Sequence, residues 1–167
     1  MKKAVWSGIV AAAGVLFLSG NAFAQVNDAK TINVTVNVNA RAKLTLGTAA
    51  ITFGDQDPDT VPTLTSAAVS VNVKARTTAA GSVTLTMIAG GDFANAAGNT
   101  IDLATLTWAA TGTNFVAGAT SKAAAQSVGS WTGSGEQVGT NTFSLPNSWS
   151  YAVGSYSVAL NYTLTAP

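Results

Sequence analysis

The sequence predicts an all-β protein, an antiparallel β-sandwich, and three observations carry this prediction. Apolar and polar residues alternate in several separate segments, which is the two-residue period of a strand with one buried face. Clusters of Gly, Asn, Asp and Pro recur between those segments and mark turns. After residue 24, no segment has the period of an amphipathic helix of ordinary length.

The first 24 residues have the three parts of a secretory signal peptide. Lys2 and Lys3 give a positive start, residues 4–20 are apolar, and Ala22-Phe23-Ala24 is a small-x-small cleavage site. Cleavage is expected after Ala24, so that the exported chain begins at Gln25. An uncleaved membrane anchor is the alternative, and Gly8, Gly14 and the Ala22-Phe23-Ala24 site fit it less well.

The exported chain carries few groups that do chemistry. It has six basic and seven acidic residues, a net charge of −1, so bulk charge attracts neither nucleic acid nor an anionic membrane. It lacks His and Cys, which excludes disulfides, an ordinary zinc site and a Cys or Ser-His nucleophile. Glu136 is the sole glutamate and lies in a glycine-rich turn. The sequence therefore does not indicate an enzyme, and no cofactor or metal is expected.

The longest alternating segment runs from Thr31 to Leu46. Its even positions are all apolar and its odd positions are all polar or charged. Strands usually span about 5–6 residues, whereas this segment would reach roughly 50 Å as one strand. It therefore reads as two strands, with residues 39–41 as a hinge, or as one long strand that bends at Ala40.

The rest of the chain reads as short strands separated by turns. The first half has a short strand over 49–54, a turn over 55–63, strands over 67–76 and 82–88, and a loop over 89–99. A strand over 101–110 with a bulge near Ala104 follows, and then a weakly patterned segment with one helical turn at 123–125. Short strands within 127–135 and 140–146 precede a closing strand in which Tyr156 to Leu164 alternate. About eight strands with regular turn signals are typical of an immunoglobulin-like antiparallel β-sandwich. A closed barrel is the structural alternative.

Two side-chain groups could form binding sites. Asp55, Asp57 and Asp59 resemble the start of a calcium loop, but the required Gly and the distant Glu are missing, so an Asp-Pro turn is the better interpretation. The three tryptophans of the exported chain could stack on a carbohydrate or pack in the core and at sheet edges; they are Trp108, Trp131 and Trp149.

Three segments resemble the subunits of chaperone–usher pili. "INVTVNVNARAKLTL" followed by "ITFGDQDP" is similar to the opening of archaic, spore-coat-U-like pilins, with an FG-x-x-DP-like turn at Phe53, Gly54, Asp57 and Pro58. "AAVSVNVKARTTAAGSVTLTM" resembles the paired strands after that turn, and "VGSYSVALNYTLTAP" resembles the closing strand, with Gly154 as the fourteenth residue counted from the C-terminus. The missing disulfide departs from archaic pilins and is typical of class 5 fimbrial pilins. Ala166 stands where classical pilins have an aromatic residue.

The resemblance implies polymerisation by donor-strand complementation. Each subunit would be an immunoglobulin-like sandwich that lacks one strand, and the N-terminal extension of the next subunit would fill the resulting groove. Residues 25–39 would be this donor-strand extension and residues 40–167 the pilin domain. The donor side chains would be Ile32, Val34, Val36 and Val38. The acceptor groove and chaperone-facing edge would include Gly154, Tyr156, Val158, Leu160, Tyr162 and Leu164.

The resemblance also implies partners and a location. The expected partners are identical or homologous pilin subunits, a periplasmic chaperone, an outer-membrane usher and a receptor on a host or another surface. The chain would pass through the periplasm into an extracellular fimbria. The alternatives are an arm kept in, or folded back onto, its own domain, and a self-contained secreted adhesin or carbohydrate-binding module. A secreted hydrolase is argued against by the shortage of acid–base residues.

Overall fold

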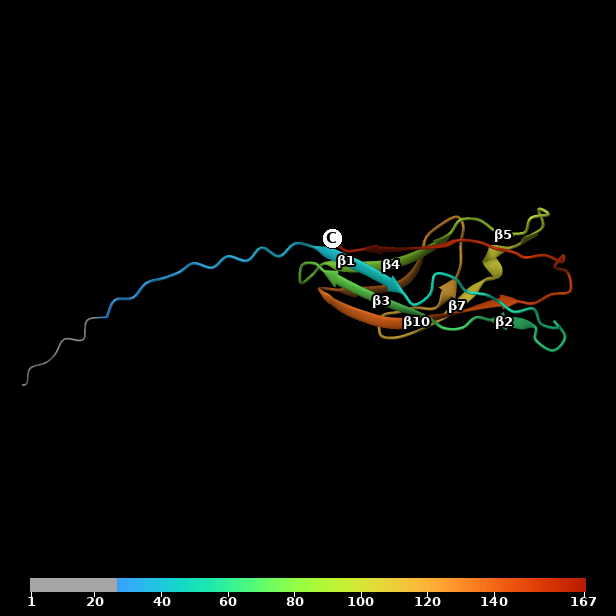
Figure 1. Cartoon of the computed structure of the whole chain (residues 1–167), viewed down its shortest axis with the longest axis horizontal. Coiled ribbons are helices and arrows are strands. Elements are labelled where there is room, and N and C mark those ends of the chain that lie inside the picture. Colours follow the sequence, from blue (N-terminus) through green and yellow to red (C-terminus); the bar gives the residue numbers. More distant parts are fainter. Residues whose placement is uncertain (1–26) are drawn as a thin grey trace, which may run out of the picture. The chain divides into compact units, whose positions relative to one another are not determined.

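The computed structural model describes residues 27–167 (Figure 1). The predicted signal peptide, residues 1–24, lies outside the described residues. The chain divides into two units, residues 1–36 and residues 37–167. A membrane-spanning helix is not found among residues 27–167, where no helix is both long and apolar enough to cross a bilayer.

Residues 37–167 fold into eleven described strands and one turn of 3-10 helix. The elements are β1 (Arg41–Leu46), β2 (Thr63–Thr65), β3 (Val69–Arg76), β4 (Ser82–Ala89), β5 (Phe93–Ala94), β6 (Thr100–Ile101), η1 (Leu103–Thr105), β7 (Thr107–Thr111), β8 (Gly118–Ala119), β9 (Gln126–Thr132), β10 (Gly135–Pro146) and β11 (Leu160–Thr165).

The strands form two main antiparallel sheets. The larger has the order β1-β3-β10-β7-β8, with β2 paired to the far end of β10, and the smaller has the order β11-β4-β9. A two-stranded sheet of β5 and β6 completes the fold. The prediction of an all-β, antiparallel, sandwich-like protein is confirmed. Both main sheets are open rather than closed into a barrel.

The core lies between the two main sheets and is built by alternation. In β3, Val71 and Val73 are fully buried while Ser70 and Lys74 face outward, and in β4 the same holds for Val83 and Leu85. Because side chains of a strand point alternately to opposite faces, the valines of one sheet pack against the apolar face of the other. Phe143 of β10 and Val128 of β9 fill the centre of this shared core.

Several predicted elements differ in the structure, and one of them is the glycine-rich turn around Glu136, which lies within β10. The segment "AAITFGD" is irregular rather than a strand, and residues 123–125 form no helical turn, because residues 122–124 are bends and residue 125 is irregular. The predicted strand over 101–110 is broken, because the Asp102 carboxylate accepts a hydrogen bond from Ala104 N at 3.0 Å and so caps η1. The bulge expected near Ala104 is thus a helical turn.

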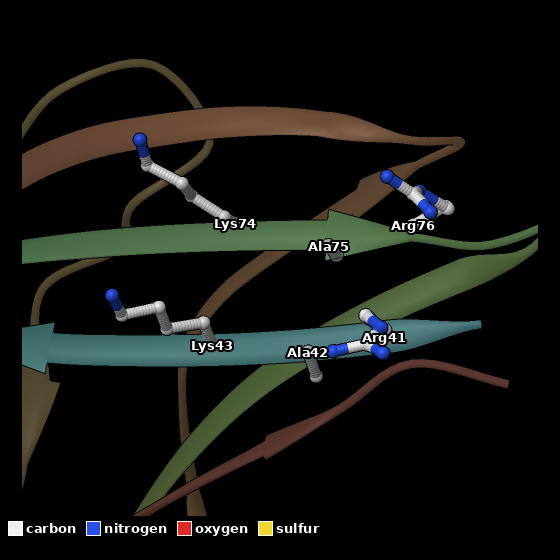
Figure 2. A pocket seen from close by; sticks show the side chains of 6 residues that line it. All are labelled: Arg41, Ala42, Lys43, Lys74, Ala75 and Arg76. Atoms are coloured by element: carbon white, nitrogen blue, oxygen red, sulfur yellow. The ribbon is translucent and has the colours of Figure 1, made fainter. Parts of the chain in front are cut away.

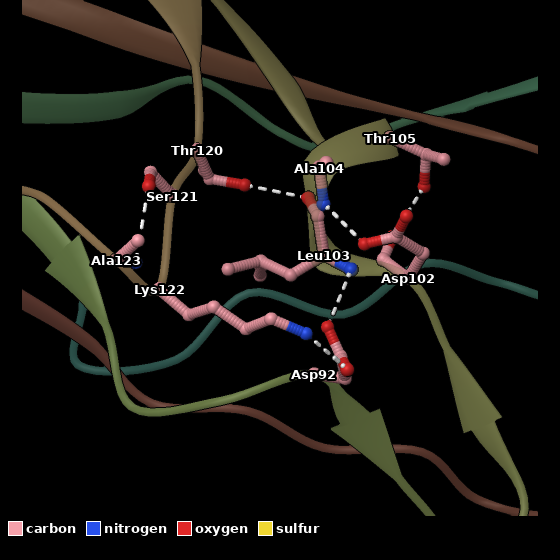
Figure 3. Close-up of polar contacts among 9 residues, drawn as sticks. All are labelled: Asp92, Asp102, Leu103, Ala104, Thr105, Thr120, Ser121, Lys122 and Ala123. Atoms are coloured by element: carbon pink, nitrogen blue, oxygen red, sulfur yellow. Dashed lines mark hydrogen bonds and ion pairs between the residues drawn. The ribbon is translucent and has the colours of Figure 1, made fainter.

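A set of polar contacts fixes η1 to its neighbours (Figure 3). Asp92 accepts a hydrogen bond from Leu103 N at 3.1 Å and pairs with the Lys122 ammonium at 2.6 Å. The buried Thr120 hydroxyl donates to the Leu103 carbonyl at 2.7 Å. The Lys122 partner lowers the pKa of Asp92 below its ordinary value, and the Leu103 hydrogen bond adds to this effect. These contacts stabilise a reversal of the chain. The polar groups in them are paired with one another.

Candidate functional site

The candidate site lies beside the edge strands of the two main sheets. Among residues 27–167, β1 is the edge of the larger sheet and pairs with β3 alone, while β11 is the edge of the smaller sheet and pairs with β4 alone. Thr77 follows β3 and Pro167 follows β11. The Thr77 hydroxyl donates a hydrogen bond to the backbone carbonyl of Pro167. Arg76 at the end of β3 pairs with Arg41 at the start of β1. The end of β11 therefore lies near the start of β1, and the two edge strands run in opposite directions.

A groove of about 1520 Å³ opens between the segments that continue these two edges, residues 46–58 and 147–162. Small-molecule pockets span roughly 300–1,000 Å³, so this groove is larger than most of them. Buried residues of the core reach it directly; they are Val69, Phe93, Ile101, Leu106, Phe143 and Leu145. The core is therefore uncovered along the side where the two sheet edges face each other.

One wall of the groove contains most of the predicted acceptor residues. Gly154, Tyr156, Val158, Leu160 and Tyr162 all line it. The exception is Leu164, which pairs with Leu85 of β4 beyond the residues that line the groove. The four larger side chains are half-buried and the residues between them are exposed, so the predicted alternation holds even where the chain is not a strand.

The segment before β11 was predicted to be part of the closing strand, but the strand begins only at Leu160. Residues 154–159 are held instead by the β5 region. Ala94 and Ser157 exchange backbone hydrogen bonds of 3.2 and 3.1 Å, and Gly90 N donates to the Ala159 carbonyl at 3.0 Å. A Cβ on Gly154 would lie 2.6 Å from Asn95 Nδ2, so a larger residue there would displace the Asn95 side chain.

The opposite wall of the groove was not predicted from the sequence to be part of a site. It is formed by residues 48–57, in which Ile51 and Phe53 are half-buried and pack against the core. Their two-residue spacing was visible in the sequence and was interpreted as a short strand. The residues keep that spacing but have no partner strand, because the neighbouring edge position is empty in the described fold.

Tyr162 links the groove to the interior. Its hydroxyl accepts a 2.9 Å hydrogen bond from Nδ2 of Asn141, a fully buried residue of β10 in the other sheet. Burial raises the pKa of Tyr162, and the Asn141 hydrogen bond partly opposes this rise. Oδ1 of Asn141 has no partner within the described residues. The hydrogen bond thus ties β11 to β10 at the floor of the groove.

The predicted donor residues lie outside any described strand. Residues 27–40 have no regular secondary structure, so one continuous strand from Thr31 to Leu46 is not formed. The four aliphatic side chains are 85, 82, 76 and 64% exposed at Ile32, Val34, Val36 and Val38. The apolar face of this segment is thus uncovered in the described chain.

The other candidate groups do not gather into one site. Trp108 and Trp131 are buried, and the indole N–H of Trp108 donates to the Val116 carbonyl at 2.8 Å. Trp149 alone is exposed, and its indole N–H donates to Asp59 Oδ1 at 3.1 Å. Asp57 accepts a hydrogen bond from Asp59 N at 2.9 Å, which is the geometry of the expected Asp-Pro turn. The three tryptophans thus form no common stacking face.

Comparison with models of protein families and with curated proteins finds no match to this chain. The functional interpretation consequently depends on the groove, the exposed segment and the chemistry of their residues.

Proposed function

We propose that this chain is a structural subunit of an extracellular fibre that polymerises by donor-strand complementation. Ile32, Val34, Val36 and Val38 of one copy would occupy the groove of the next copy. One observation carries the proposal: an apolar groove lies open between residues 46–58 and 147–162, which continue the two sheet edges, in a chain that also exposes four aliphatic side chains at alternate positions.

The spacing of the two surfaces supports this assignment. Donor side chains two residues apart on an extended strand are separated by roughly 7 Å, and Tyr156, Val158, Leu160 and Tyr162 repeat along the groove wall with the same period. A strand placed there would form backbone hydrogen bonds to one or both edges and would remove an exposed sheet edge. Burial of four aliphatic side chains contributes about 6–12 kcal/mol before the cost of ordering the segment.

The completed domain would be an immunoglobulin-like sandwich whose last strand comes from a neighbour. The resemblance to archaic and class 5 pilins supports the same assembly, with export through the signal peptide and with a periplasmic chaperone and an outer-membrane usher. The β11 edge would be the surface that the chaperone covers before assembly. No catalytic role is proposed for the chain.

The experiment compares unheated and boiled samples of the exported chain on an SDS gel. Strand-exchanged polymers should resist SDS in the cold and give one band after boiling, because a strand buried between two edges dissociates slowly. Replacement of Val34 and Val36 by Asp should abolish the ladder. The matched control replaces Thr35 and Asn37 by Asp, which places the same charges on the other face of the strand.

A ladder that persists in the Val34→Asp, Val36→Asp variant would show that another segment makes the polymer. A monomer under all conditions, confirmed by size-exclusion chromatography, would contradict the proposal. That result would favour a self-contained secreted β-sandwich adhesin or carbohydrate-binding module, for which Trp149 is the exposed aromatic residue.

A further inference from the structure

Four of the six basic residues that follow the predicted cleavage site lie together on one face of β1 and β3. They are Arg41, Lys43, Lys74 and Arg76, named here the basic patch. Arg41 is paired in register with Arg76, and Lys43 with Lys74. Figure 2 shows the two lysines on neighbouring strands and the two arginines at the end of those strands.

This arrangement costs stability in an isolated domain. Like charges directly opposite each other on neighbouring strands repel. Within residues 27–167 the patch has one ion pair, from Lys74 Nζ to Glu136 at 3.2 Å. The hydrogen bond from Asn72, and after it the one from Lys74, lowers the pKa of Glu136, so this carboxylate is charged at neutral pH. Its single negative charge still leaves the four basic residues with an excess of positive charge. An anionic partner would offset the repulsion.

Asp55, Asp57 and Asp59 form an acidic loop at the opposite end of β10. The basic patch lies beside the start of β10, because Gly135 pairs with Ala75 and Glu136 pairs with Lys74. The acidic loop lies beyond its last residue, because Asn147 Nδ2 donates to the Gln56 carbonyl at 2.9 Å. A strand of this length spans roughly 40 Å, so the two charged regions are at opposite ends of the domain (Figure 1).

We propose that the basic patch of one copy binds the acidic loop of the next copy. This contact rests on the proposed polymerisation. Arg41 follows the donor residue Val38 by three positions, about 10 Å of extended chain, and Asp55 and Asp57 line the acceptor groove. A donor strand that fills the groove up to the acidic loop therefore brings its own basic patch to that loop.

The charges also select the direction of the donor strand. In one direction, the C-terminal end of the donor strand would lie at the neighbour's basic patch. The basic patches of the two copies would then meet and repel each other, and a reciprocal exchange of the two donor strands would give a closed dimer. In the reverse direction unlike ends meet, and repetition gives an open head-to-tail filament. The inserted strand then runs parallel to β1 and antiparallel to β11.

A charge-swap series tests the contact through the rate of polymer formation. Arg76→Glu alone and Asp55→Arg alone should each slow assembly about tenfold at low salt, because they remove electrostatic steering. The chain with both substitutions should recover most of the rate, since each interface again joins opposite charges. Raised ionic strength should slow the unaltered chain and reduce the difference among variants. Equal rates at low salt, or failure of the double variant to recover, would overturn the contact.

Cross-linking tests the same contact without depending on rate. The chain has no cysteine, so Arg76→Cys with Asp55→Cys places two unique thiols at opposite ends. A short bis-maleimide added to assembled polymers should give a ladder that survives boiling. Cold ladders without boiled ladders, or a boiled dimer from Arg76→Cys alone, would refute this contact while leaving strand exchange intact. Absence of any cold ladder would refute both proposals.

Discussion

Two segments of this chain have nearly the same pattern and opposite environments. Residues 32–38 carry Ile32, Val34, Val36 and Val38, and residues 69–75 carry Val69, Val71, Val73 and Ala75. The first four are at least 64% exposed, whereas the second four are at most 7% exposed. Alternation thus specifies that a strand has an apolar face, but it does not specify which core that face joins.

The largest expected effect comes from the same substitution made in each segment. Val73→Asp should unfold the domain, since an unpaired buried carboxylate costs on the order of 3–5 kcal/mol or more. Val36→Asp should leave the domain's unfolding midpoint unchanged and weaken the polymer instead. Urea denaturation followed by Trp fluorescence measures the first effect, and the cold SDS ladder measures the second.

The comparison would fail if Val36→Asp destabilised the domain as strongly as Val73→Asp does. Residues 32–38 would then belong to the core of their own chain. Thr35→Asp is the control for a charge placed in the same segment on the polar face.

A smaller effect is expected at Tyr162, where the groove meets the buried core. Tyr162→Phe removes the acceptor of the Asn141 amide and leaves a fully buried donor unpaired, which should cost about 1–3 kcal/mol of unfolding free energy. Tyr156→Phe is the matched control, because its hydroxyl bonds to the Ala152 carbonyl at an exposed site. Chemical denaturation of both variants measures the two unfolding free energies. Similar decreases in both variants would mean that the hydrogen bond to Asn141 does not contribute to stability.

The smallest effect concerns the polar contacts around η1. Lys122 holds the pKa of Asp92 below its ordinary value of 3.8 in the folded protein. The pair therefore stabilises the fold above that pH, and the contribution disappears as the pH falls through the lowered pKa. Lys122→Met should reduce the melting temperature slightly at neutral pH and match the unaltered chain in strong acid. A difference that persists in strong acid would instead reflect lost packing.

The strands were the most predictable part of the fold. β3, β4 and residues 140–146 of β10 are visible as alternation in the sequence, because a face that is buried against another sheet needs apolar residues at every second position. The misjudged elements were short or interrupted: η1, the irregular segment 49–54, residues 154–159, and residues 135–139, which were predicted as a turn and belong to β10. The conformations of the first three depend on the Asp102 cap, an empty edge position and contacts with β5, none of which is a periodic signal.

The candidate site was half predictable. Gly154, Tyr156, Val158, Leu160 and Tyr162 were found from the closing alternation, while Ile51 and Phe53 were not recognised as the opposite wall. Leu164 shares the alternation of the predicted residues but lies outside the groove. A sequence pattern places a residue on a face, but only the relative position of the two sheets decides where that face is uncovered.

The sequence by itself determined the fold class, the apolar faces of the main strands and the surplus alternating segment before β1. It did so because backbone geometry ties burial to a two-residue period. The tertiary structure alone decided that β1 and β11 are edges running in opposite directions, that an apolar groove lies between the segments continuing them, and that the charges gather at the two ends of β10. These features arise from contacts between residues distant in the chain, which local periodicity does not encode.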